Sequence, residues 1–241
     1  MSTYVIGDIH SGARALEQVL ERVQPSKEDT FLFLGDYVDG WSEAVETVDF
    51  LLDFEKRYSC VFIKGNHDYL TYRYLKKGEQ NPLWLASGGQ QTVESYAAVS
   101  TEKKKQHMAF YAQLKNYHID SENRLFVHAG FTNVKGPRYE YFEKMVFWDR
   151  TLWELARSLD PTLSQDNPNY PNRLLLFKEI YIGHTPVTRL GKTVPLNYAN
   201  VWNLDTGAAY KGPLSLMDVD TKQVWQSDPV YTLYPLESGR N

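Results

Sequence analysis

Acidic, amide and imidazole side chains follow several apolar segments of this sequence, each close to a glycine. They occur in Gly7-Asp8-Ile9-His10, Gly35-Asp36, Gly65-Asn66-His67-Asp68, His128-Ala129-Gly130 and Gly183-His184-Thr185. Oxygen and imidazole donors without a thiolate suit manganese, iron or zinc in a reactive centre better than a structural zinc site. Glycine beside a ligand lets the backbone turn sharply and approach an ion. The pattern therefore predicts a metal site.

Each segment alone has a simpler interpretation. Gly-Asp and Asp-Gly are common turn sequences, and a lone histidine at a strand end is usually a hydrogen-bonded structural residue. However, four of the six histidines in the chain fall in these five segments. Coincidental turns do not readily explain that concentration, so we interpret the segments jointly as one site.

The elements that must position these side chains alternate between strand and helix in the first third of the chain. Apolar runs predict strands over residues 3–8, 31–36 and 60–66, and apolar periodicity predicts helices over 13–23 and 43–56. Such a β-α-β-α-β order implies parallel strands joined by right-handed crossovers. In open α/β sheets, ligands bind beyond the carboxyl ends of the strands, where these side chains lie.

The remaining chain predicts a change of architecture. Residues 69–120 have mostly helical patterns, 124–130 and 179–185 resemble further strands, and 131–179 are less regular. From Val194 onward, short β-rich stretches separated by turn residues predict antiparallel hairpins. We expect α/β opening into α+β, with two packed sheets, helices outside, and one domain over residues 1–241.

Composition narrows the class of protein. The chain has 241 residues, 42% of them hydrophobic and 23% charged, with a net charge of −4. These values are typical of a globular protein, and the slight acidity favours neither nucleic acid nor a membrane surface. Cys60 is the single cysteine, so no internal disulfide can form, as is usual in a reducing compartment. No signal peptide or long apolar run is evident, and we expect a cytoplasmic protein.

The motifs "GDIH", "GDYVDG", "GNHD", "HAG" and "GHT", in this order, resemble those of the calcineurin-like metallophosphoesterases. Within that superfamily the chain is most similar to the bacterial serine/threonine protein phosphatase group and to the symmetrical dinucleoside tetraphosphatases. Segments 84–96, 147–153 and 203–219 extend the resemblance over nearly the whole chain. The resemblance implies a four-layer αββα sandwich of two mixed sheets flanked by helices.

The resemblance also implies a site with two divalent cations, with manganese as the first expectation and iron or zinc as alternatives. One ion is expected on Asp8 and His10. Asp36 is expected to bridge both ions. The ligands expected to complete the coordination of the second ion are Asn66, His128 and His184.

The reaction implied by the family is attack of a metal-bridging hydroxide on phosphorus. His67 matches the general acid, Asp39 the carboxylate that orients it, and Arg150 a phosphate-binding arginine. Two alternatives stay open: Asp39 as a turn residue that bonds its own backbone, and Arg150 as a surface residue paired with Glu154. Asp68 is expected to be structural.

One motif departs from the family pattern. Family members usually have "GDxVDRG", whereas this chain has Asp39-Gly40-Trp41 and so lacks a phosphate-binding arginine. Lys64, Arg14 and Arg73 are candidates to replace it. Trp41 either stacks on an aromatic substrate or packs at the start of a helix, as a tryptophan there commonly does. We assign no chemistry to the aspartate of "LDTG", Asp205.

Three functions are therefore compared. The first is a phosphomonoesterase acting on phosphoproteins or small phosphate esters, with no nucleic-acid or membrane partner. The second is a dinucleoside tetraphosphatase that cleaves a phosphoanhydride. The third is a non-catalytic scaffold with the same fold, which the complete set of candidate ligands disfavours.

Overall fold

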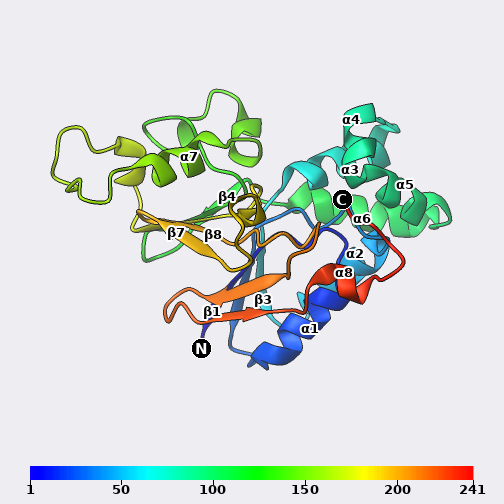
Figure 1. Cartoon of the computed structure of the whole chain (residues 1–241). Coiled ribbons are helices and arrows are strands. Elements are labelled where there is room, and N and C mark those ends of the chain that lie inside the picture. Colours follow the sequence, from blue (N-terminus) through cyan, green and yellow to red (C-terminus); the bar gives the residue numbers. More distant parts are fainter. Residues whose placement is uncertain (241) are drawn as a thin grey trace.

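The computed structural model describes residues 1–240 and contains two five-stranded sheets packed face to face (Figure 1). The first sheet has the order β10 (Val224–Gln226), β9 (Ser215–Asp218), β1 (Thr3–Ile6), β2 (Thr30–Phe33) and β3 (Ser59–Phe62). The second has the order β4 (Tyr117–Ile119), β5 (Arg124–Val127), β6 (Glu179–Ile182), β8 (Val201–Asn203) and β7 (Leu196–Tyr198). Both sheets are mixed, as predicted.

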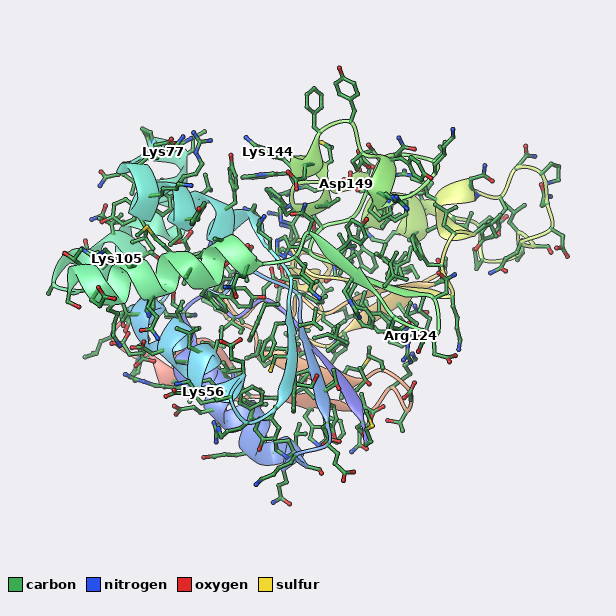
Figure 2. All side chains as sticks on the ribbon, turned by 180° about the vertical axis from the view of Figure 1, so that it is seen from behind. Lys56, Lys77, Lys105, Arg124, Lys144 and Asp149 are labelled. Carbon is green, nitrogen blue, oxygen red and sulfur yellow. The ribbon has the colours of Figure 1, made fainter. Side chains whose placement is uncertain are left out.

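Helices lie outside the two sheets. The α-helices are α1 (Ala13–Val23), α2 (Ala44–Phe54), α3 (Asn66–Lys77), α4 (Pro82–Trp84), α5 (Gln90–Ala97), α6 (Thr101–Gln113), α7 (Thr151–Ser158) and α8 (Val230–Leu233). Short 3-10 or π turns are η1 (Leu85–Gly89), η2 (Pro137–Tyr139), η3 (Glu143–Phe147), η4 (Asn172–Leu174) and η5 (Val187–Leu190). Seen from behind, α6 carries Lys105, and Lys56 lies just after the end of α2 (Figure 2).

The first sheet contains the predicted β-α-β-α-β unit. Strands β1, β2 and β3 are parallel, with Val5 opposite Leu32 and Leu32 opposite Val61. Helix α1 buries Leu16, Val19 and Leu20 on one face, as its periodicity indicates. The carboxyl ends of the three strands therefore lie at one edge of the sheet.

The antiparallel hairpins predicted from Val194 onward are confirmed, and the structure divides them between the two sheets. Strands β7 and β8 do form an antiparallel pair, as do β9 and β10. However, β8 also pairs in parallel with β6, and β9 joins β1 in the other sheet. The chain crosses between the sheets after β8, because Val201 packs beside Ile180 whereas Leu216 and Met217 belong with the first sheet.

The core has three parts because alternate residues of a strand point to opposite faces. Val5 and Leu32 pack between the sheets against Phe126 and Tyr181, whose rings stack with centroids 4.8 Å apart. Neighbouring Ile6 instead belongs to the cluster beneath α1 and α2. The layers are thus helix, sheet, sheet and helix, and the cluster between the sheets holds the two sheets together.

Within residues 1–240, none of the helices combines the length and apolar character needed to cross a membrane.

Candidate active site

Two overlapping clusters of side chains lie where the strands of both sheets end. Asp8, His10 and Asp36 form one cluster, and Asp36, His128 and His184 form the other. In each cluster the possible ligand atoms lie within 4.8 Å of one another. Asn66 joins the second cluster, since its Oδ1 lies 2.9 Å from His184 Nδ1 and 3.2 Å from His128 Nε2. All six residues predicted as ligands are therefore close together, and Asp36 is common to both clusters.

The turns that carry these residues have unusual backbone conformations. Nine non-glycine residues of the described chain have positive φ, and five of them lie here: His10, Ser11, Asp36, Asp39 and His184. Positive φ is costly for such residues and is concentrated at functional sites, where the surrounding structure holds it. These strained turns thus direct the side chains of His10, Asp36 and His184 toward the two clusters.

Two glycines allow the backbone to contact the carboxylates. A Cβ at Gly65 would lie 2.1 Å from Asp36 Oδ1, and a Cβ at Gly183 would lie 1.9 Å from Asp8 Oδ1. Even alanine at either position would displace a carboxylate. The space beside these two carboxylates therefore admits only glycine at positions 65 and 183.

Backbone carbonyls orient the imidazoles. His10 Nδ1 donates to Asp39 O at 3.0 Å, and His128 Nδ1 donates to Leu34 O at 2.8 Å. The Nε2 lone pairs then face the clusters, where His128 Nε2 lies 3.3 Å from Asp36 Oδ2. A carbonyl that fixes the tautomer in this way is typical of metal-binding histidines. His184 Nε2 is buried and has no hydrogen-bond partner among the described residues.

The buried carboxylates of the two clusters would be stabilised by additional positive charge. Burial, together with neighbouring Asp205 and Asp36, raises the pKa of Asp8 well above its usual value. Burial would also raise the pKa of Asp36, but His128 holds it well below its usual value. Conversely, burial would lower the pKa of His128, but Asp36 raises it to about 10. Closely spaced carboxylates, together with imidazoles whose tautomers are fixed, are suitable ligands for divalent cations. Asp36 is placed so that it could contact an ion in each cluster.

His67 and Asp39 form a buried pair beside the clusters. His67 Nδ1 lies 2.6 Å from Asp39 Oδ2, so the other ring nitrogen of His67 is left for the cavity. Asp39 also accepts from Trp84 Nε1 and Thr92 Oγ1, both at 2.5 Å. The alternative of Asp39 as a turn residue bonding its own backbone is wrong. Sequence reasoning missed Trp84 and Thr92, although both lie in segment 84–96 of the resemblance.

Asp68 holds the turn that carries Asp36. Its carboxylate accepts from the backbone N–H groups of Gly65 and Asp36 at 2.8 Å and of Tyr37 at 2.9 Å. Burial and the Asp36 charge raise the pKa of Asp68 to about 7. The expected structural role of Asp68 agrees with these contacts.

We predict that Asp68→Ala lowers the free energy of unfolding by roughly 3 kcal/mol, because three buried N–H donors lose their acceptor. Urea unfolding followed by fluorescence measures this change. Asp53→Ala is the control, since the Asp53 side chain is 72% exposed, and it should change stability by less than about 0.5 kcal/mol. An equally small effect of Asp68→Ala would contradict the assigned role.

A cavity of about 300 Å³ opens over the clusters and the His67–Asp39 pair. Its lining includes Asp36, Asn66, His67, His184, Asp205, Leu83, Trp84, Trp148 and three arginines, Arg150, Arg189 and Arg240. Arg150 helps to lower the pKa of His184, after burial and the charge of His128. Arg150 is exposed, as its alternative interpretation expected, but within residues 1–240 no ion pair joins it to Glu154. The cavity lining thus combines the carboxylates of Asp36 and Asp205 with the three arginines.

The sequence model of the calcineurin-like phosphoesterases matches residues 1–210. The chain belongs to this family. Members depend on a dinuclear metal centre, and the two clusters that share Asp36 provide candidate ligands for one. The protein is therefore a hydrolase of the metallophosphoesterase superfamily.

The similar proteins include two kinds of phosphatase. Serine/threonine-protein phosphatase 1 of Salmonella typhimurium is 23% identical over 218 residues, covering 88% of this chain and 89% of the relative. The asymmetrical bis(5'-nucleosyl)-tetraphosphatase of a Geobacillus species is 25% identical over 209 residues, covering 82% and 79%. A solved serine/threonine phosphatase from Saccharomyces cerevisiae has a TM-score of 0.61 at 12% identity, covering 95% and 80%. The fold is thus that of the calcineurin-like phosphoesterases.

The structure corrects the expectations about the arginine missing at Gly40. Lys64 bonds Asn116, Arg14 pairs with Glu43 and Arg73 pairs with Glu79, and none of the three lines the cavity. Partners outside the site hold these side chains away from it.

Trp41 does not stack on a substrate. It is fully buried, its ring stacks on Tyr234 at 5.1 Å, and its Nε1 donates to Ala208 O at 2.8 Å. The interpretation of Trp41 as packing at the start of a helix is correct, because both its face and its polar atom are already satisfied.

Asp205, to which the sequence assigned no role, lies in the candidate site. It is buried, lines the cavity, and accepts from Gly207 N at 3.0 Å. Burial and the Asp36 charge raise its pKa to about 6, against the effect of that hydrogen bond. Asp205 therefore adds negative charge beside Asp8, which increases the demand for cations.

Proposed function

We propose that the protein is a dinuclear-metal-dependent phosphomonoesterase that hydrolyses phosphate esters of proteins or small molecules. The observation that carries the proposal is a single carboxylate, Asp36, shared by two ligand clusters beneath a cavity that His67 also lines. The bacterial serine/threonine phosphatase among the relatives supports the same reaction class.

We assign the metal ligands as follows. Asp8, His10 and Asp36 would hold one ion, and Asp36, Asn66, His128 and His184 would hold the other. Manganese is the proposed metal, with iron or zinc as alternatives, since all three accept imidazole and oxygen ligands. Two such ions would supply positive charge for phosphoryl oxygens and would lower the pKa of a water molecule bound to them.

Side chains at the cavity would complete the reaction. His67 would donate a proton to the oxygen that leaves phosphorus, since the contact of its Nδ1 with Asp39 turns the other nitrogen toward the cavity. Asp39 would keep the ring in this orientation, held in turn by Trp84 and Thr92. Arg150 would bind a phosphoryl oxygen from the cavity wall.

A substrate panel tests this function. The purified protein, loaded with manganese, is expected to release phosphate from p-nitrophenyl phosphate and from phosphoserine or phosphothreonine peptides. Metal analysis of the same sample shows whether ions are bound. A protein that binds two ions but hydrolyses no phosphomonoester would overturn the proposal.

A second candidate is a dinucleoside polyphosphate hydrolase, favoured by the similarity to an asymmetrical tetraphosphatase. Chromatography of the products from diadenosine tetraphosphate separates the candidates. Formation of ATP and AMP would indicate asymmetrical cleavage, and two ADP molecules would indicate symmetrical cleavage, which was the sequence-based alternative. Turnover of this substrate well above that of every monoester would favour the second candidate.

A further inference from the structure

Arg240 reaches the site from the segment that follows α8 and turns back toward α3 (Figure 1). Its backbone N–H donates to Ala209 O at 2.9 Å, and its guanidinium lies 5.4 Å from the centre of the Tyr210 ring. Its Nη1 is 3.4 Å from His10 Nε2. Arg240 therefore joins the cavity wall beside the first ligand cluster.

Two glycines, Gly40 and Gly88, lie against this side chain, and Gly239 precedes it in the chain. A Cβ at Gly40 would lie 3.4 Å from Arg240 Cγ, and a Cβ at Gly88 would lie 3.0 Å from it. Gly239 has φ of +59° and would place a Cβ 2.8 Å from the Trp41 ring. An arginine at position 40, where the family usually has one, would enter the space that Arg240 fills. An arginine at position 40 and Arg240 would therefore place a guanidinium at the same part of the cavity wall.

The Arg240 guanidinium makes no direct ion pair in the described structure, although its charge acts on Asp205 across the cavity and opposes the rise in the pKa of that carboxyl. Within residues 1–240, no carboxylate forms an ion pair with it, and its Nε is buried without a hydrogen-bond partner. Its positive charge contributes, after burial, to the lowered pKa of His10. A partly buried cation that makes no direct ion pair is only partly compensated, so an anion in the cavity would supply a direct partner.

We propose that Arg240 binds a phosphoryl oxygen of the substrate and replaces the arginine missing at Gly40. This inference rests on the proposed function, because it assigns the group that the reaction acts on. The planar guanidinium can donate two parallel bonds to phosphate oxygens. Arg240 Nη1 donates to His10 Nε2; if His10 held a metal ion through this nitrogen, Nη1 would be free to donate to the anion.

The experiment compares Arg240→Gln and Arg240→Lys with the wild type and with Arg22→Gln. Arg22 is the control because it is partly exposed and pairs with Asp228 on the surface. Calorimetry measures the affinity of the manganese-loaded proteins for inorganic phosphate, and kinetics with p-nitrophenyl phosphate give kcat and KM. Metal content and the midpoint of thermal unfolding are measured for each protein.

Arg240→Gln is expected to weaken phosphate binding and lower kcat/KM by about 10- to 100-fold, as for loss of a charged hydrogen bond. Arg240→Lys should lose less, and guanidinium ion should partly restore Arg240→Gln. Unchanged phosphate affinity in Arg240→Gln would overturn the assignment, as would equal loss of metal and thermal stability in both variants. A wild type that binds phosphate through Arg240 but hydrolyses no ester would instead overturn the proposed function alone.

Discussion

His67→Asn is expected to lower kcat for alkyl phosphates by about 10²–10⁴-fold while both metal ions stay bound. The substitution removes the proposed proton donor but keeps a polar side chain at the cavity. The ring of His67 is held by Asp39 at 2.6 Å, and it is not a member of either ligand cluster. Hydrolysis should therefore slow while the metal-binding residues stay in place.

The dependence on the leaving group makes this prediction specific. Nitrophenolate leaves readily without a proton, so the loss should be much smaller for p-nitrophenyl phosphate than for an alkyl phosphate. His118→Asn is the control, since His118 lies on β4 against Phe126, and it should leave kcat unchanged. Equal losses for both leaving groups would argue against proton donation by His67.

Asp36→Asn is expected to have a still larger effect, because it weakens both ligand clusters at once. We predict that bound manganese falls to one ion or fewer and that kcat/KM falls by more than about 10³-fold, as the low pKa of the bound water is lost. Elemental analysis of dialysed protein gives the metal content, and initial rates give kcat/KM.

The amide oxygen introduced by Asp36→Asn can still accept the hydrogen bond that Asp36 Oδ1 receives from His67 N at 2.9 Å. The local fold should therefore persist, and circular dichroism checks this. Asp53→Asn, an exposed carboxylate beside Lys56, is the matched control and should bind metal normally. Two tightly bound ions in Asp36→Asn would refute a bridging role.

Much of the site could be predicted because its signals are local. Asp8, Asp36 and Asn66 each follow a short apolar strand and a glycine, and parallel strands end at the same edge of a sheet. The sequence therefore indicated where these side chains would gather. The same reasoning placed His67 beside them, since it follows Asn66 directly.

Other parts of the site have no local signal. Trp84 and Thr92 act on Asp39 through an indole N–H and a hydroxyl, in a helical segment whose pattern is otherwise that of packing residues. Arg240 is 230 positions from His10, and nothing in its spacing indicates their contact. The division of β8 and β9 between sheets was missed for a similar reason, because strand pairing depends on distant apolar partners.

Residues that contact each other in the site are far apart in the sequence, and this has a consequence for folding during translation. Asp8 accepts a hydrogen bond from the backbone of His184, 176 positions later, and contacts this distant form late in folding. A nascent polypeptide on the ribosome that has not yet emerged past β6 cannot assemble the second ligand cluster. Assembly of the complete site is thus tied to translation of most of the chain, and chains truncated before that point lack His184, one of the six proposed ligands.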